Sequence, residues 1–166
     1  MAKVLVTGMS GTGKSTALRM LGARGHRVVD ADYAGWSHFV TSGDGSREWM
    51  WREDAMAELL ASHREGHLFV AGCSANQGRF YPAFDRIVLL TAPEAVLLAR
   101  IAARTENPFG KDPSERAQVQ RDLREVEPLL RATSTDVLDS TLPIADVVRR
   151  LEAIAGPSAT PSRERR

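Results

Sequence analysis

The chain has 166 residues and carries 22 Lys and Arg against 21 Asp and Glu, so it has the size of one domain and lacks the basic field of a nucleic-acid or anionic-membrane binder. Its single cysteine, Cys73, excludes an internal disulfide framework, and no apolar run approaches the roughly 20 residues of a membrane span. Since no signal-peptide pattern precedes the first predicted strand, we expect a cytoplasmic protein whose partners are small molecules, with neither nucleic acid nor membrane among them.

The first predicted strand covers residues 2–7, and a helix with an apolar face is expected to begin near Lys14. Between them, residues 8–15 read Gly-Met-Ser-Gly-Thr-Gly-Lys-Ser, the G-x-x-x-x-G-K-S pattern of a phosphate-binding P-loop. Glycines let successive N–H groups converge on a polyphosphate, and the helix N-terminus adds the positive end of its dipole. A glycine-rich turn that carries a lysine by chance is the alternative, and the flanking strand and helix argue against it.

The P-loop predicts individual roles. Lys14 is expected to be catalytic and to reach the β- and γ-phosphates of ATP, and the Ser15 hydroxyl is expected to bind Mg²⁺. The residues of this segment predicted to bind ATP are Gly8, Ser10, Gly11, Thr12, Gly13, Lys14, Ser15 and Thr16.

A second strand is predicted over residues 27–30, and it runs into Asp30-Ala31-Asp32. In open parallel sheets, ligands bind at the carboxyl ends of the strands, so both carboxylates are expected to face the same crevice as the P-loop. We therefore interpret Asp30 and Asp32 as functional; a solvated pair of acids in a turn is the alternative.

Residues 33–66 form a predicted helical insertion that holds all three tryptophans. After a flexible turn at residues 41–45, Ser46 is expected to cap a helix that ends at Gly66. Ordinary packing explains most of its tryptophans. Arg52, beside aromatic rings, is a candidate for binding an anionic acceptor.

The next predicted strand, residues 68–71, is a continuous apolar run, which is typical of a parallel strand buried on both faces. The polar segment that follows is either an acceptor-binding loop, in which Asn76, Gln77 and Arg79 could bind acceptor hydroxyls or phosphates, or a simple polar turn. Cys73 at its start is interpreted as a small buried residue, with a reactive thiol as the alternative.

After a strand over residues 86–90, the spacing of Thr91 and Glu94 predicts a capping box for the following helix. Arg100 and Arg104, four residues apart on that helix, are interpreted as a clamp for base and phosphates, with solvated charge as the alternative. A loop and a second capping box then predict a mobile basic lid over residues 105–116, which would exclude water during phosphoryl transfer.

The last strand is predicted over residues 134–139, followed by an amphipathic helix that Gly156 ends. Residues 157–166 are expected to be disordered. Alternating strands and helices after a P-loop predict an α/β fold with three layers, in which a five-stranded parallel sheet of expected order 2-3-1-4-5 lies between helices. We expect one domain over residues 1–156, with the acceptor-binding insertion at residues 33–66.

Over residues 2–155 the chain resembles the nucleoside monophosphate kinase and shikimate kinase group of P-loop kinases, and its Asp-x-Asp looks like that of dephospho-coenzyme A kinases. The resemblance implies that Asp30 holds Mg²⁺ through water and that Asp32 contacts or deprotonates the acceptor hydroxyl. It also implies that Arg100 stacks on adenine, that catalytic Arg104 reaches phosphate and that backbone around Ser140 and Thr141 touches the adenine edge.

Two features depart from common P-loop patterns. The strand ending at Ala71 lacks the aspartate of a conventional Walker B motif, and Gly72-Cys73-Ser74 stands where shikimate kinases have three glycines. No Asn-Lys-x-Asp guanine motif and no ABC signature is present, which argues against GTPases and transporter ATPases.

The sequence therefore predicts an ATP- and Mg²⁺-dependent phosphotransferase that acts on a small metabolite. Among small metabolites, a nucleoside or nucleotide is the acceptor that we favour. The alternatives are an ATP-binding regulator or adaptor that transfers nothing, and a kinase of the shikimate or dephospho-coenzyme A type. A modifier of antibiotics or RNA ends would share the chemistry, although the near-neutral charge argues against RNA.

Overall fold

A five-stranded parallel sheet forms the centre of the protein. The structure is a computed structural model that describes residues 1–33 and 35–157. Its strands follow the order β2-β5-β1-β6-β7. When only the strands of this sheet are numbered along the chain, the order is 2-3-1-4-5. The predicted fold class and strand order are therefore confirmed. The strands are β1 (Lys3–Thr7), β2 (Arg27–Asp30), β5 (Leu68–Ala71), β6 (Arg86–Thr91) and β7 (Asp136–Asp139).

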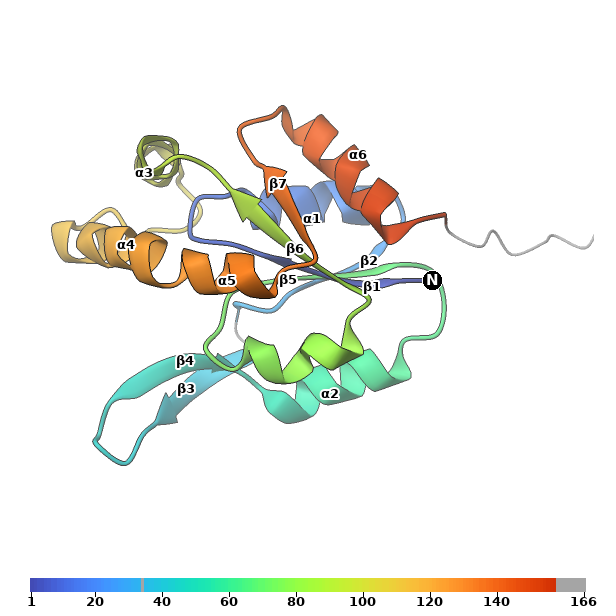
Figure 1. Cartoon of the computed structure of the whole chain (residues 1–166). Coiled ribbons are helices and arrows are strands. Elements are labelled where there is room, and N and C mark those ends of the chain that lie inside the picture. Colours follow the sequence, from blue (N-terminus) through green and yellow to red (C-terminus); the bar gives the residue numbers. More distant parts are fainter. Residues whose placement is uncertain (34, 158–166) are drawn as a thin grey trace, which may run out of the picture.

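Helices cover both faces of this sheet (Figure 1). One face carries α1 (Lys14–Ala23) and α6 (Ile144–Ala155), which pack against each other. The opposite face carries α2 (Glu53–Ser62) and the 3₁₀ helix η1 (Gln77–Ala83). Helix α5 (Glu127–Thr133) also packs against β6, where its Thr133 meets Tyr81 of η1. The remaining helices, near the carboxyl end of the sheet, are α3 (Glu94–Ala103) and α4 (Pro113–Glu125).

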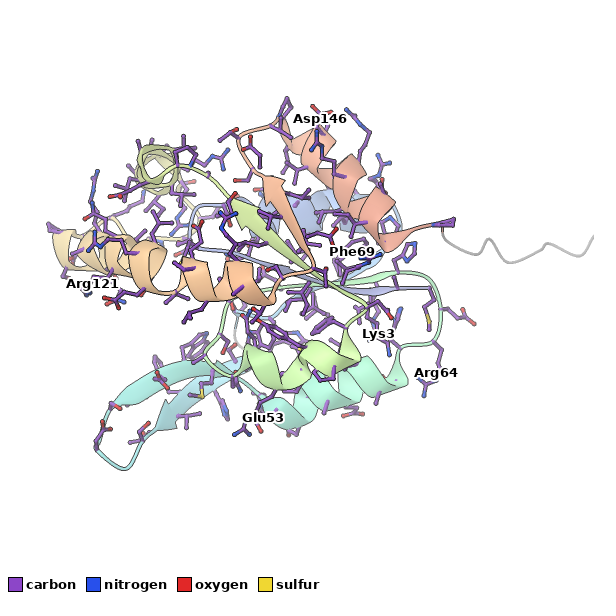
Figure 2. All side chains as sticks on the ribbon, viewed as in Figure 1. Lys3, Glu53, Arg64, Phe69, Arg121 and Asp146 are labelled. Atoms are coloured by element: carbon purple, nitrogen blue, oxygen red, sulfur yellow. The ribbon has the colours of Figure 1, made fainter. Side chains whose placement is uncertain are left out.

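Successive side chains of each strand point to opposite faces of the sheet, which divides the core into two layers. Along β1, Val4 and Val6 face α1 and α6, whereas Leu5 faces α2 and η1. Figure 2 shows Phe69 inside the molecule and Arg121 projecting from its surface. Parallel strands buried on both faces read as continuous apolar runs, which is why residues 68–71 were recognisable from the sequence.

The insertion differs from the prediction, because its first half is a β-hairpin and not a helix. Strands β3 (Ser37–Thr41) and β4 (Arg47–Trp51) pair antiparallel, with Phe39 opposite Trp49. Gly45 takes a positive φ of 84° in the turn, and Phe39 and Trp49 pack edge to face with ring centroids 4.8 Å apart. An Asp-Gly turn between β-branched and aromatic residues favours a hairpin over a helix. The helix predicted from Ser46 begins only at Glu53, with Arg52 at its N-cap.

Neither predicted capping box forms in full, because in the second one Glu115 accepts from the Gly110 amide at 2.9 Å and not from the amide of Asp112. Helix α3 begins at Glu94 directly after Pro93, whose ring disfavours helical geometry in the residue before it, so Thr91 lies outside the helix. Helix α4 begins at Pro113 as predicted, where the Asp112 carboxylate accepts a hydrogen bond from the Ser114 amide at 2.8 Å.

The C-terminal helix confirms its prediction, since α6 ends before Gly156, which has a φ of 84°. The predicted disordered tail lies, apart from Pro157, outside the described residues. Within residues 1–33 and 35–157, no helix combines the length and the apolar character needed to cross a bilayer.

Candidate active site

The P-loop connects β1 to α1 at the carboxyl end of the sheet, as predicted. Gly13, at the N-cap of α1, has a φ of 90°, a conformation that glycine adopts without strain. The Lys14 ammonium donates to the carbonyl oxygens of Gly8 at 2.7 Å and Met9 at 3.1 Å. The loop is braced from inside by the buried Thr12 hydroxyl, which donates to the Met9 carbonyl at 2.9 Å. Lys14 is therefore held across the loop by main-chain oxygens.

Two arginines tie the P-loop to neighbouring loops. Arg100 donates to the Gly11 carbonyl at 3.3 Å and to the Ser140 carbonyl at 2.6 Å. Arg104 donates to the Ser10 hydroxyl at 3.2 Å and to the Phe109 carbonyl at 2.6 Å. Both residues lie beside the predicted nucleotide site.

The spacing of Arg100 and Arg104 predicted that they share one face of a helix, and this prediction is wrong. Helix α3 ends at Ala103, and Arg104 follows it in extended geometry. Arg104 therefore belongs to the loop that begins the predicted lid, whereas Arg100 belongs to the helix.

Ser15 and Asp30 form a pair of oxygen ligands at the edge of the P-loop. The Ser15 hydroxyl donates to the Asp30 carboxylate at 2.6 Å. Mg²⁺ is commonly bound by one or two protein oxygens together with phosphates and water, and this pair fits that chemistry. Within the described part of the chain, no cluster of three or more His, Cys, Asp or Glu could hold a metal by itself.

Asp32 lies one residue beyond Asp30 and is held by donors from two other elements. Its carboxylate accepts from the Cys73 amide at 3.0 Å and from the Trp51 indole N–H at 3.4 Å. Burial raises the pKa of Asp32 above its ordinary value, and Lys14, the Cys73 amide and Trp51 oppose the rise. A carboxylate with a raised pKa accepts a proton more readily, which suits a group facing an acceptor hydroxyl.

Gly72 makes room for this arrangement. A Cβ atom added to Gly72 would lie 2.7 Å from the Asp32 Oδ1 atom and 2.9 Å from the Trp51 Cζ2 atom. Both distances are shorter than packed atoms allow, so Asp32 and Trp51 approach the backbone here only because residue 72 is glycine.

The predicted acceptor-binding residues are used differently from one another. The Asn76 side chain is buried, accepts from the Trp51 amide and donates to the Trp51 carbonyl at 2.9 Å, so it braces the end of β4. Arg79 forms an exposed ion pair with Glu53 at 3.0 Å. Arg52 is exposed at the start of α2, and within the described residues no ion pair involves it.

The residues predicted to touch the adenine edge, Ser140 and Thr141, have different partners. Thr141 donates from its hydroxyl and its amide to Asp139 at 2.6 and 2.8 Å. These bonds lower the pKa of Asp139. The neighbouring Ser140, which is buried, contacts Arg100 instead. Thr16 is exposed on α1, where its hydroxyl accepts from Arg19 at 3.4 Å.

The surroundings of Cys73 fit its interpretation as a small packed residue. It packs beside the cluster of Met9, Leu89 and Leu97, and burial raises its pKa. Since the thiolate is the reactive form, this thiol is a poor nucleophile.

Three further residues support the site, and Trp51 is the one of them that the sequence did not single out. Trp51 donates to Asp32, Ser140 receives Arg100, and the buried Gln77 bonds the Thr7 hydroxyl at 3.2 Å. The polar loop after residue 71 was a signal for Gln77. Trp51 carried no such signal, because its contact depends on the hairpin.

The sequence profile of the AAA domain family matches residues 4–121. This match covers more than half of the chain, which therefore belongs to the AAA domain family. No curated protein sequence matches the chain at a significant level.

Solved structures of the same fold include shikimate kinase from Acinetobacter baumannii in complex with shikimate, at TM-score 0.64 and 18% identity over 91% of this chain and 90% of that chain. A gluconokinase from Sinorhizobium meliloti 1021 has TM-score 0.59 and 22% identity over 92% and 90% of the two chains. Deoxyadenosine kinase from M. mycoides with bound dATP has TM-score 0.60 and 10% identity over 91% and 97%. These likenesses concern the fold, and they confirm the predicted resemblance to P-loop small-molecule kinases.

Proposed function

We propose that this protein is an ATP- and Mg²⁺-dependent phosphotransferase that acts on the hydroxyl group of a small metabolite. The observation that carries the proposal is the position of Asp32. Its carboxylate lies beside the P-loop lysine and is anchored by the Cys73 amide at 3.0 Å. A binder that only held ATP would not need a second, half-buried carboxylate next to the triphosphate site.

The proposed roles follow from the geometry. Lys14 neutralises charge on the transferred phosphoryl group, and Ser15 with Asp30 holds Mg²⁺, directly or through water. Asp32 orients the acceptor hydroxyl and receives its proton. Arg104, which links the P-loop to residues 105–111, contributes positive charge from the lid. Positioning and charge neutralisation then supply most of the catalysis.

The acceptor is a small hydroxylated molecule. The structural relatives include a shikimate kinase, a gluconokinase and a deoxyadenosine kinase. The fold therefore accommodates hydroxylated substrates both with and without a nucleoside base. A nucleoside or nucleotide is the acceptor that we propose before the others.

The experiment that tests the function is ATP consumption with Mg²⁺ across a panel of acceptors, with the product mass measured directly. The panel contains nucleosides, nucleoside monophosphates, shikimate, gluconate and dephospho-coenzyme A. One acceptor gaining a single phosphate establishes the phosphotransferase. ATP binding without transfer to any acceptor contradicts it.

Replacement of Lys14 provides the control for that assay. Lys14→Ala is expected to lower turnover by about 100-fold or more, because the phosphoryl charge loses its main partner. Lys3→Ala is the matched variant, since Lys3 begins β1 at the end of that strand away from the P-loop. Equal activity of Lys14→Ala and Lys3→Ala would contradict the assignment.

One observation favours the alternative of an ATP-binding regulator. Trp51 is fully buried and touches Asp32, so an indole takes part of the space expected between the insertion and the P-loop. The same acceptor panel separates the two functions. A regulator would bind ATP with the same affinity whichever acceptor is present, and no acceptor would be phosphorylated.

A further inference from the structure

The β3–β4 hairpin presents an aromatic surface directly beside the proposed catalytic carboxylate. Antiparallel pairing places Ser37 opposite Trp51, Phe39 opposite Trp49 and Thr41 opposite Arg47. Because side chains alternate along a strand, all of these residues point to one side of the hairpin. We call Phe39, Arg47, Trp49 and Trp51 the aromatic face.

Two hydrogen bonds join this face to Asp32. The Trp49 indole N–H donates to the Asp32 carbonyl at 2.9 Å, and the Trp51 indole N–H donates to the Asp32 carboxylate at 3.4 Å. The aromatic face therefore starts at the carboxylate that faces the acceptor and runs outward along the hairpin, which stands out from the body next to the start of α2 (Figure 1).

The outer part of the face is open to solvent. Trp51 is buried, whereas Trp49 is 40% exposed and Phe39 is 56% exposed. Since the only N–H of Trp49 is already bonded to Asp32, the exposed part of this residue is an apolar ring surface. Two large aromatic side chains, adjacent and exposed beside a reactive group, indicate a binding surface.

Arg47 marks the far end of the face. Its guanidinium lies 4.4 Å from the centre of the Phe39 ring and covers that ring from one side. Phe39 and Trp49 meet edge to face at 4.8 Å, and Trp49 keeps 40% of its surface exposed, so its ring offers area that a flat ligand can cover. Arg47 adds positive charge beyond it, within reach of a polar or anionic substituent.

We propose that the acceptor is an alcohol that carries a flat, unsaturated ring, as a nucleoside does, and that this ring stacks on Trp49 while the hydroxyl group lies at Asp32. The Trp49 ring and the Asp32 carboxylate are separate contact points, because Trp49 bonds the Asp32 main chain whereas the carboxylate is held by Cys73 and Trp51. An acceptor that uses both has its hydroxyl outside its ring, as a nucleoside does. In a cyclic polyol the hydroxyl is on the ring itself. This inference rests on the proposed function, because it assigns the acceptor of the same site.

The test compares two groups of acceptors under saturating ATP and Mg²⁺. Adenosine, guanosine, cytidine and uridine carry an aromatic ring several bonds from a primary hydroxyl, and shikimate, gluconate and glycerol do not. We expect phosphorylation of at least one nucleoside, measured by product mass, and a KM lower than for every member of the second group.

Variants of the aromatic face then test the stacking. Trp49→Leu is expected to raise the KM for the nucleoside by about tenfold, the usual effect of losing a stacked base, with the KM for ATP unchanged. Trp49→Phe keeps a ring and should recover most of the affinity. His38→Leu is the matched control, because exposed His38 is on the opposite side of the same hairpin. Thermal melts of each variant verify that it is folded.

Three outcomes would overturn the inference. Transfer only to acceptors without an aromatic ring contradicts it and leaves the proposed function intact. An unchanged nucleoside KM in folded Trp49→Leu contradicts it as well. Equal loss in Trp49→Phe and Trp49→Leu would assign the effect to the Trp49 hydrogen bond with Asp32 and would exclude stacking. ATP binding without transfer to any acceptor contradicts both this inference and the proposed function.

Discussion

The two ends of the central sheet use polar groups in opposite ways. At the amino end, the polar side chains beside the strands bond to other parts of the chain. The His67 ring accepts from the Ala2 amide at 3.0 Å and contacts the Gly156 carbonyl at 2.9 Å, and the Asp85 carboxylate accepts from the Lys3 amide at 2.7 Å. This end closes the domain by joining segments that are far apart in sequence.

At the carboxyl end, charged groups are concentrated and only partly neutralised by the chain. Lys14 donates to carbonyl oxygens, and Asp32 is half-buried near it with a pKa raised by its partial burial. Groups that a ligand would neutralise reduce the stability of the free protein, which is the usual relation between function and stability. The comparison teaches that burial by itself does not identify a site. Within the described residues, buried polar side-chain atoms have hydrogen-bond partners at both ends, so what distinguishes the carboxyl end is that Lys14, Asp30 and Asp32 bring charge together there.

The replacement Asp32→Asn should separate the two ends most clearly. Turnover is expected to fall by about 100-fold or more, because the general base is lost. ATP affinity should be retained. The melting temperature should rise at neutral pH, because the raised pKa of Asp32 means that its charged form is less favourable in the folded state.

Kinetics and thermal melts of Asp32→Asn and of Asp54→Asn measure both effects. Asp54 is an exposed acid in the first turn of α2 and serves as the matched control. Normal turnover of Asp32→Asn would remove the proposed role of Asp32, and a lower melting temperature would show that its charge stabilises the fold.

A methyl group at position 72 tests the packing of the carboxyl end. Gly72→Ala should lower the free energy of unfolding by about 1–3 kcal/mol, because its Cβ overlaps Asp32 and Trp51. It should also reduce turnover, since Asp32 must move. Gly78→Ala is the control, because no atom lies within 4 Å of a Cβ at Gly78. Denaturant titration measures the difference, and equal stability of the two variants would contradict the geometry.

The amino end should respond to acid through His67. Burial lowers the pKa of His67 below its ordinary value of 6.5, so the unfolded chain binds the proton more readily than the folded one. The stability that neutral His67 contributes is complete above pH 6.5 and is lost as the pH falls through the lower, folded pKa. The groups facing it are the Met1 amino group, His26 and Glu152.

Denaturant midpoints between about pH 8 and about pH 5 measure this dependence. His67→Ala is expected to be less stable throughout and to show a shallower fall toward acid pH. The control His38→Ala should keep the wild-type slope, because His38 is exposed. An unchanged slope in His67→Ala would show that another group is responsible.

The smallest effect is expected from the ion pair on the surface of the amino end. Arg24 donates to both oxygens of Glu152 at 2.7 Å, but the Arg24 side chain is 52% exposed. Such pairs contribute little and are screened by salt. Arg24→Gln should lower the melting temperature slightly at low ionic strength and not at all in concentrated salt. A large loss that salt does not affect would mean that the amino end depends on this pair.

The P-loop, the parallel strands and the end of the last helix were predictable because each depends on neighbours in the sequence. A strand, a glycine-rich loop and a helix follow one another at residues 2–23, and Gly156 ends a helix by its own conformational freedom. The pair Asp30 and Asp32 was predictable for a related reason, since the end of a parallel strand has a known relation to the ligand crevice.

The hairpin was not predictable in the same way, because residues 46–51 suit either a helix or a strand and their partner, residues 37–41, decides between them. Tertiary structure alone placed Trp51 against Asp32, directed Asn76 to the backbone of β4 and brought Arg100 to Ser140. These contacts join residues 19 to 40 positions apart. The amino-acid sequence by itself therefore determined the phosphate-binding loop and the sheet. Long-range packing decided the surroundings of Asp32, because burial and hydrogen bonding there depend on segments that meet only in the folded chain.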